Sequence, residues 1–184
     1  MHSDNLARSL DSLARRLREE GIPFAVVGAL AMRHHGYARY TEDIDILTTP
    51  DGLDLIHRNL VGRGYVPKAR GLRKRLRDTE FGIDIDILTA GEPAGASGSP
   101  VTYPVPTGRA FRRIRGIPIP VLPLLIAFKL ASGMWGHRLR DLGDVQELIV
   151  FNRLTKSFAR RLPAGVRPKF LELLGEAGRR QAPG

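Results

Sequence analysis

The hexapeptide Asp-Ile-Asp-Ile-Leu-Thr occurs twice in this chain, at residues 43–48 and again at residues 84–89. Side chains alternate between the two faces of a β-strand, so each copy predicts a strand with carboxylates on one face and isoleucines on the other. Aspartate is depleted in strands, and two like charges on one face cost stability unless a cation offsets them. One copy alone is most simply a half-exposed strand with an acidic outer face. Two copies favour two halves of one metal site.

The composition limits the ligands that such a site can use. No cysteine is present, which excludes thiolate ligands, thiolate nucleophiles and disulfides. The adjacent His34 and His35 point in different directions on a helix, and we expect neither to bind a metal. Converging carboxylates are the ligands that Mg²⁺ prefers, and paired Mg²⁺ ions can activate an attacking hydroxyl and stabilise a leaving phosphate oxygen.

The charge of the chain favours a polyanionic partner such as RNA, DNA or a nucleotide. The 29 lysines and arginines exceed the 19 acidic residues, which gives a net charge of +10. Six basic residues and no acid lie in the segment from Lys68 to Arg77, between the two acidic strands, and a second basic segment runs from Arg109 to Arg115. We predict that these segments, and above all the first, bind an RNA backbone or a triphosphate tail.

No segment of the sequence predicts association with a membrane. The amino-terminal stretch carries early acidic residues and no long apolar run, so it is not typical of a signal peptide. The longest apolar run, residues 121–128, is far shorter than the roughly 20 residues of a membrane-spanning helix. We therefore expect a cytoplasmic protein.

Hydrophobic periodicity predicts an α/β (α+β) fold with a short mixed β-sheet, flanked by helices. An amphipathic helix over residues 6–17 precedes alternating strands and helices, and residues 91–100 have the composition of a loop. The expected strands are 23–28, 44–47, 65–66 and 83–88, and the expected helices are 29–35, 52–60, 124–132, 139–153 and 167–177. We expect an α/β core with an amino-terminal helix at residues 1–120 and a helical part at residues 121–184.

A glycine marks the turn from the first predicted strand into the following helix. At Gly28 the backbone can approach a phosphate closely, and the amides at a helix start can bind it. A lone glycine turn more often serves packing. Here Arg39, Thr41, Asp43 and Asp45 follow it closely, so we include Arg39 and Thr41 among the nucleotide-binding candidates.

These motifs resemble the nucleotidyltransferase (DNA polymerase β-like) superfamily over roughly residues 22 to 150. Residues 26–47 resemble its glycine turn and Asp-x-Asp strand, and residues 81–88 resemble the strand of its third carboxylate. Residues 124–149 are similar to the Lys and Arg-x-x-Asp-x-x-Asp region of bacterial AbiEii-type and MenT-like nucleotidyltransferases. The resemblance implies a nucleotidyltransferase fold.

The resemblance also implies roles for individual acids. Asp43 and Asp45 would bind two Mg²⁺ ions, and Asp86 matches the third acid because it directly precedes an apolar pair. Asp84 is the alternative third ligand.

Further residues would bind the nucleoside triphosphate. Gly28 and the amide of Ala29, which replaces the usual glycine or serine, would face its phosphates. Lys129 would reach the phosphates or the base, and Asp141 or Asp144 would support Lys129 or the acceptor. From spacing alone, Lys129 could equally extend from an apolar helix to solvent, and the two acids could form surface ion pairs with Arg138 and Arg140.

The expected activity is Mg²⁺-dependent transfer of a nucleoside monophosphate to a hydroxyl acceptor. The basic charge favours RNA as the acceptor, and the resemblance to MenT-like toxins suggests the 3′ end of tRNA and an antitoxin partner. Two alternatives remain open. The acceptor could be a protein side chain or a small molecule such as an aminoglycoside, or the chain could bind nucleotide or RNA without turnover.

Overall fold

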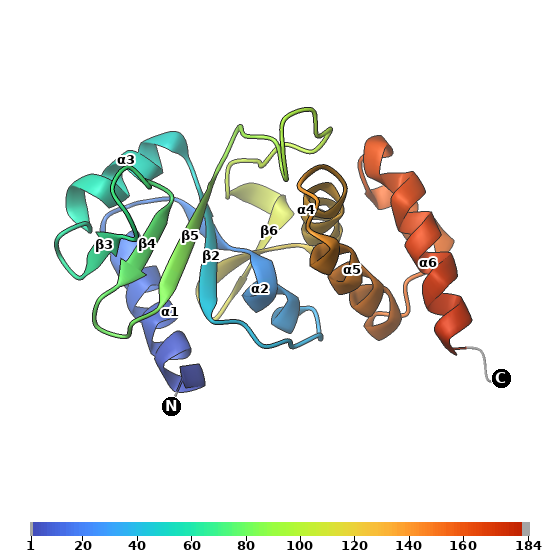
Figure 1. The fold of residues 1–184 in the computed structure, drawn as a ribbon, viewed down its shortest axis with the longest axis horizontal. Helices are drawn as coiled ribbons and strands as arrows, with labels where there is room; N and C mark the ends of the chain where they lie inside the picture. The colour runs from blue at the N-terminus through green and yellow to red at the C-terminus, as the bar shows by residue number, and fades with distance from the viewer. Residues whose placement is uncertain (1, 182–184) are drawn as a thin grey trace.

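The computed structural model describes residues 2–181, which form a mixed α/β fold (Figure 1). Three short 3₁₀ turns lie at Gly108–Ala110, Lys156–Arg161 and Ala164–Val166. The other elements are α1 (His2–Glu19), β1 (Phe24–Val26), α2 (Gly28–His34), β2 (Asp43–Thr48), α3 (Pro50–Asn59), β3 (Tyr65–Pro67), β4 (Arg75–Asp78), β5 (Asp84–Thr89), β6 (Phe111–Ile114), β7 (Ile117–Pro120), α4 (Leu122–Trp135), α5 (Leu139–Phe151) and α6 (Arg167–Gln181).

The main sheet brings the two repeated hexapeptides together. Its strand order is β1-β2-β5-β4-β3, with β2 and β5 parallel and the other neighbouring strands antiparallel. The parallel pair is in register, so that Asp43 lies opposite Asp84 and Asp45 lies opposite Asp86. The two acidic faces therefore form one surface at the centre of the sheet.

The isoleucine face of these strands is buried against α1 and α3. Ile44 and Ile85, which are neighbours in the register, are 0% and 1% exposed. The same hydrophobic cluster contains Leu13 and Leu17 of α1 and Ile56 of α3. Burial of each such side chain contributes about 1.5–3 kcal/mol to stability, which holds the two acidic strands side by side.

A second hydrophobic cluster lies on the carboxylate side of the sheet. It joins Leu47 of β2 to α4, α5, α6 and the β6–β7 hairpin. Figure 1 shows α4, α5 and α6 side by side at the carboxyl-terminal end of the molecule. The most apolar of them is α4, which is buried over Leu125 to Gly133. Within residues 2–181, no helix combines the length and apolar character needed to cross a membrane.

The structure confirms the mixed fold and most of the predicted elements. Three strands were missed: β4 and both strands of the β6–β7 hairpin. In β4 the only apolar residue is Leu76, which is buried between exposed Arg75 and Arg77, so the sequence has too few apolar positions to predict the strand. The strand β7 was not predicted because two of its four residues are prolines. Within the described residues it pairs with no strand other than β6.

The chain passes from sheet to helices at the predicted point, since β7 ends at Pro120 and α4 begins at Leu122. However, the second hydrophobic cluster includes residues from both sides of this point, such as Leu47 and Leu125. The division of the chain at residue 120 stays a prediction.

Candidate active site

Three carboxylates converge at the centre of the sheet. Ligand oxygens of Asp43, Asp45 and Asp86 all lie within 4.8 Å of one another. The in-register pairing explains this, because it places two residues of β2 and one of β5 on one face. Asp84 lies outside this group, and its oxygens accept hydrogen bonds from Lys68 (2.5 Å) and Arg77 (2.8 Å).

The charges in the cluster are poorly compensated within the protein. Burial and, to a smaller extent, the neighbouring Asp43 and Asp86 carboxylates together raise the pKa of Asp45 to about 6, against the lowering effect of Lys129 and Arg138. A donor set of three carboxylates suits a hard divalent cation such as Mg²⁺ or Mn²⁺. A cation there would relieve the repulsion that raises this pKa.

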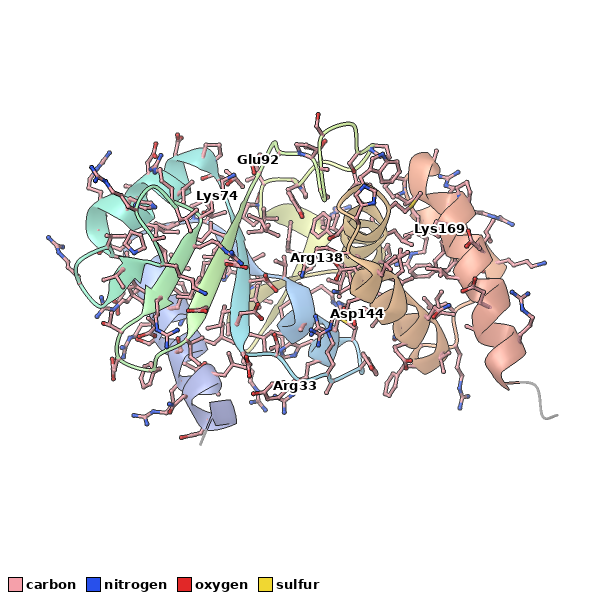
Figure 2. The ribbon with its side chains drawn as sticks, in the orientation of Figure 1. Arg33, Lys74, Glu92, Arg138, Asp144 and Lys169 are labelled. Atoms are coloured by element: carbon pink, nitrogen blue, oxygen red, sulfur yellow. The ribbon has the colours of Figure 1, made fainter. Side chains whose placement is uncertain are left out.

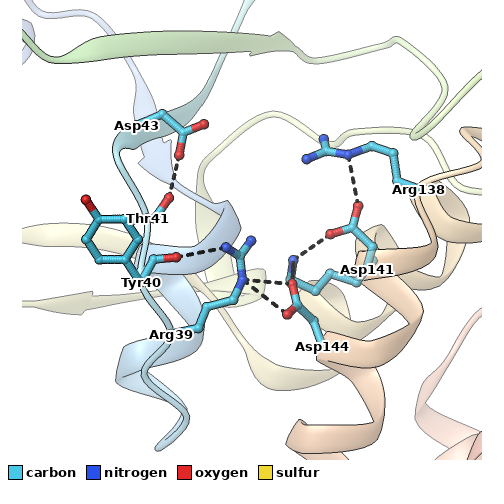
Figure 3. A network of polar contacts seen from close by, with 8 residues as sticks. Arg39, Tyr40, Thr41, Asp43, Arg138, Asp141 and Asp144 are labelled. Carbon is cyan, nitrogen blue, oxygen red and sulfur yellow. Dashed lines mark hydrogen bonds and ion pairs between the residues drawn. The ribbon is translucent and has the colours of Figure 1, made fainter.

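Side chains outside the cluster orient two of its acids. The Thr41 hydroxyl donates a hydrogen bond to the Asp43 carboxylate (Figure 3). Arg75, which lies opposite Asp86 in the register of β4 and β5, donates from Nε at 3.0 Å and from Nη2 at 3.4 Å to the two Asp86 oxygens. Arg75 is therefore the counter-ion of the third acid.

The glycine turn lies directly against the cluster. Gly28 has φ +62°, and a Cβ added to it would lie 1.9 Å from the Asp45 Oδ2. The amide of Val27, which precedes α2, donates to the Asp45 carbonyl at 2.9 Å, and no side chain caps that helix start. Ala29 is 4% exposed, so its side chain is buried. Only glycine permits both this backbone conformation and this closeness to the carboxylate.

A buried ionic network borders the cluster from the helical side. Lys129 of α4 is 5% exposed and donates to Asp141 at 2.8 Å and to Asp144 at 2.6 Å, both on α5. Arg39, in the loop before β2, contacts Asp144 through Nε at 3.1 Å, and Arg138 lies 3.5 Å from Asp141. Figure 3 shows Arg39 reaching across to Asp144, with Asp141 and Arg138 beside it. Lys129 thus does not extend to solvent.

The network favours the ionised form of Asp141. Burial alone would raise the pKa of Asp141, but the Lys129 ammonium, the hydrogen bonds to the carboxylate and the nearby Arg138 together outweigh burial, and the pKa lies below its ordinary value. Ser132 also donates a hydrogen bond to this carboxylate. Three cations, Lys129, Arg39 and Arg138, pair with the two anions Asp141 and Asp144, so both acids are compensated within the network.

One cavity of about 70 Å³ joins the carboxylate cluster to this network. Its lining includes Gly28, Asp45 and Lys129, which are far apart in the sequence. It also includes Tyr103, which packs edge-to-face on Phe128 at 4.9 Å and whose pKa burial raises to about 12. The cavity is smaller than the roughly 300 Å³ of typical ligand pockets, so a nucleotide would need the open surface beside it.

Three polar residues that line this cavity were not predicted from the sequence as site residues: Tyr103, Ser132 and Arg138. Tyr103 lies in an irregular proline-rich stretch without periodicity, so the sequence gives no signal for it. Ser132 lies one helical turn after Lys129 on α4, and that spacing could have indicated it.

The segment from Lys68 to Arg77 presents little free positive charge. Five of its six basic side chains form ion pairs with carboxylates, and Figure 2 shows one such pair, Lys74 and Glu92. The pairs are Lys68 and Arg77 with Asp84, Arg73 with Asp54, Lys74 with Glu92, and Arg75 with Asp86. Most of its charge therefore compensates acids of the protein itself.

Comparisons with known proteins identify the fold. No protein-family model matches the chain, and no curated protein matches its sequence. The solution structure of the antibiotic-resistance factor ANT(2″)-Ia is similar with a TM-score of 0.59 at 12% identity, over 97% of this chain and 100% of that chain. A putative nucleotidyltransferase from Helicobacter pylori is similar with a TM-score of 0.51 at 15% identity, over 97% of this chain and 95% of that chain.

A second structure of ANT(2″)-Ia, in complex with adenylyl-2″-tobramycin, has a TM-score of 0.52 at 12% identity and covers 98% of this chain and 99% of that chain. These identities are low, and the likeness shows the fold. The chain has a nucleotidyltransferase fold, and its carboxylate cluster lies at the centre of that fold's sheet.

The closeness of Gly28 to Asp45 can be tested with Gly28→Ala and the matched control Gly21→Ala. Both glycines have positive φ, +62° and +64°, but an added Cβ at Gly21 meets no atom within 4 Å. We expect both variants to lose about 1–2 kcal/mol of unfolding free energy from backbone strain. Only Gly28→Ala should weaken Mn²⁺ binding, by roughly tenfold or more, in an electron paramagnetic resonance titration. Equal Mn²⁺ affinity in the two variants would contradict this geometry.

The raised pKa of Asp45 predicts a pH-dependent stability. The carboxyl is neutral in the folded protein up to a pKa of about 6, so its contribution to stability is present below its unfolded pKa and is lost as the pH rises through 6. In metal-free buffer, Asp45→Asn should match the wild type near pH 4 and exceed its unfolding free energy above pH 6, by up to about 3 kcal/mol. Urea denaturation at a series of pH values measures this difference.

Asp84→Asn is the control with the opposite sign. Burial opposes ionisation of Asp84, but hydrogen bonds from Lys68 and Arg77 outweigh it and lower its pKa. Its stabilising effect is therefore present above the unfolded pKa and is lost at lower pH. This variant should be less stable than the wild type at pH 7, and the same sign for both variants would refute the account.

Proposed function

We propose that this protein transfers a nucleoside monophosphate from a nucleoside triphosphate to a hydroxyl acceptor. The observation that carries the proposal is the in-register pairing of β2 and β5, which brings Asp43, Asp45 and Asp86 within 4.8 Å of one another. Such a group of acids costs stability, and a role in binding a cation accounts for it.

In this proposal the three carboxylates bind Mg²⁺, with two ions expected. When bound, Mg²⁺ supplies positive charge to the reacting phosphate and to the oxygens that attack and leave it. The acceptor oxygen forms a bond to the α-phosphorus, the bond to the pyrophosphate oxygen breaks, and the hydroxyl proton passes to a carboxylate or to water. Thr41 orients Asp43 for this role through its hydrogen bond.

The residues around the cluster would bind the triphosphate. Gly28 leaves room for a phosphate beside Asp45, because the turn has no side chain and the helix start has no side-chain cap. Lys129 and Arg138 line the same cavity and would neutralise phosphate oxygens. Arg39, Asp141 and Asp144 hold Lys129 in place through the buried network.

RNA is the acceptor that the charge of the chain favours. With a net charge of +10, the protein attracts polyanions and repels cationic acceptors. The exposed Arg138, Arg75 and Lys68 each form an ion pair with an acid of the protein, so the net charge, rather than these three side chains, favours RNA. We further propose the 3′ end of tRNA as the acceptor hydroxyl, and a toxin role with an antitoxin partner, on the sequence resemblance to MenT-like proteins.

A small hydroxylated acceptor is the second candidate. ANT(2″)-Ia, whose fold covers nearly all of this chain, has been seen in complex with adenylyl-2″-tobramycin. The net charge of +10 disfavours a cationic aminoglycoside relative to RNA. A protein side chain as acceptor, and binding without turnover, remain as outcomes of the test below.

The experiment incubates the protein with Mg²⁺ and each α-³²P-labelled nucleoside triphosphate. Separate reactions contain total bacterial RNA, tobramycin, or no added acceptor, and the double variant Asp43→Ala/Asp45→Ala is run beside the wild type. We expect label on RNA with the wild type and none with the variant. Label on tobramycin or on the protein would move the acceptor to those classes. No label with any acceptor, while RNA is retained on a filter by both forms, would overturn the catalytic proposal.

A further inference from the structure

A second charged feature lies away from the carboxylates, in a cleft between α1 and the β6–β7 hairpin. The cleft has a volume of about 460 Å³ and is lined by Arg8, Arg15 and Arg18 of α1 and by Arg115 of the hairpin turn. Phe81, from the turn before β5, also lines it, and the Arg8 guanidinium lies 5.0 Å from the centre of its ring. We call this feature the arginine cleft.

The arginine cleft and the carboxylates lie on opposite faces of the main sheet. The apolar side of α1 packs on the isoleucine face, through contacts of Leu13 and Leu17 with the cluster that contains Ile44. The carboxylates alternate with these isoleucines and so point to the other face. A ligand in the cleft therefore does not occupy the candidate active site.

The positive charge of the cleft is available to a partner. All four arginines are exposed, and none of them forms an ion pair with any carboxylate in the described part of the chain. Asp11 and Glu80 also line the cleft, so four positive charges face two negative ones. This contrasts with the segment from Lys68 to Arg77, where five of six basic side chains are paired.

The spacing of the arginines fits an extended polyanion. Arg8, Arg15 and Arg18 are seven and three residues apart, which places them on one side of α1. Ten residues of helix extend over about 15 Å, whereas the charges of one nucleic-acid strand follow one another at about 3.4 Å along the helix axis. A single phosphate would leave most of this row without a partner. An anionic membrane is a poorer match, because the apolar side of α1 is already buried in the core.

We propose that the arginine cleft binds the phosphate backbone of RNA. Contacts to several phosphates in a row would position an RNA without reading its sequence, since only Phe81 offers an aromatic face there. The choice of RNA rests on the proposed acceptor. Binding in the cleft itself requires no nucleotidyl transfer.

The test compares salt dependence of RNA binding between matched variants. The cleft variant is Arg15→Gln/Arg18→Gln, and the control is Arg160→Gln/Arg179→Gln, which removes the same charge from exposed positions in the carboxyl-terminal region. Binding of a fluorescein-labelled RNA hairpin is measured by anisotropy over a range of salt concentrations. The plot of log affinity against log salt has a negative slope. The magnitude of this slope should decrease by about 2 for the cleft variant and stay unchanged for the control.

A substitution of Arg115 alone provides an independent test of the cleft. Arg115 has φ +49°, a conformation that asparagine tolerates, so Arg115→Asn should fold and should lower the slope by about 1. Equal slopes in cleft and control variants, or an unchanged slope at Arg115→Asn, would overturn the proposal.

Mn²⁺ binding separates this inference from the proposed function. The cleft variants should bind Mn²⁺ as the wild type does, because the carboxylates lie on the other face of the sheet. RNA binding that is lost only in the cleft variants supports the cleft even if no transfer activity is found. If these variants show transfer activity and bind RNA as the wild type does, the proposed role of the cleft is refuted and the proposed function is not.

Discussion

The repulsion among Asp43, Asp45 and Asp86 is the constraint on which the site depends. Burial, together with this repulsion, raises the pKa of Asp45 from 3.8 to about 6, which corresponds to about 3 kcal/mol of unfavourable energy at neutral pH. The opposite face of the same strands offsets this cost. Burial of Ile44 and Ile46 alone contributes about 3–6 kcal/mol, taking about 1.5–3 for each side chain. The sheet can therefore hold three acids together without a cation and remain folded.

The in-register parallel pairing of β2 and β5 is what brings the three acids together. A shift of one residue between β2 and β5 would turn one set of acids toward α1, and both buried faces would be disrupted. The antiparallel pairing of β4 with β5 places Arg77 opposite Asp84, and Lys68 forms a second ion pair with it, so the fourth acid has cationic partners of its own. Identical hexapeptides thus contribute unequally, two acids from β2 and one from β5.

The strands and their acidic faces could be predicted from the sequence, because alternation is a local property. The parallel pairing could not, since it depends on how the chain between residues 49 and 83 crosses over. The same limit applies to the basic segment from Lys68 to Arg77. Its charges suggest a polyanion partner, and only the cross-strand pairing of Arg75 with Asp86 reveals that they compensate the acids of the sheet. The contact of Lys129 with Asp144, in contrast, could be expected, because the family resemblance implied that Asp141 or Asp144 would support Lys129.

The most direct measurement of the central claim is Mn²⁺ binding to Asp86→Asn and Asp84→Asn, followed by electron paramagnetic resonance. The two substitutions make the same chemical change at neighbouring positions of one face of β5. The account predicts that Asp86→Asn weakens binding by roughly tenfold or more, and that Asp84→Asn stays within about twofold of the wild type. Equal losses in the two variants, or a larger loss at Asp84, would show that the three acids identified here are not the metal site.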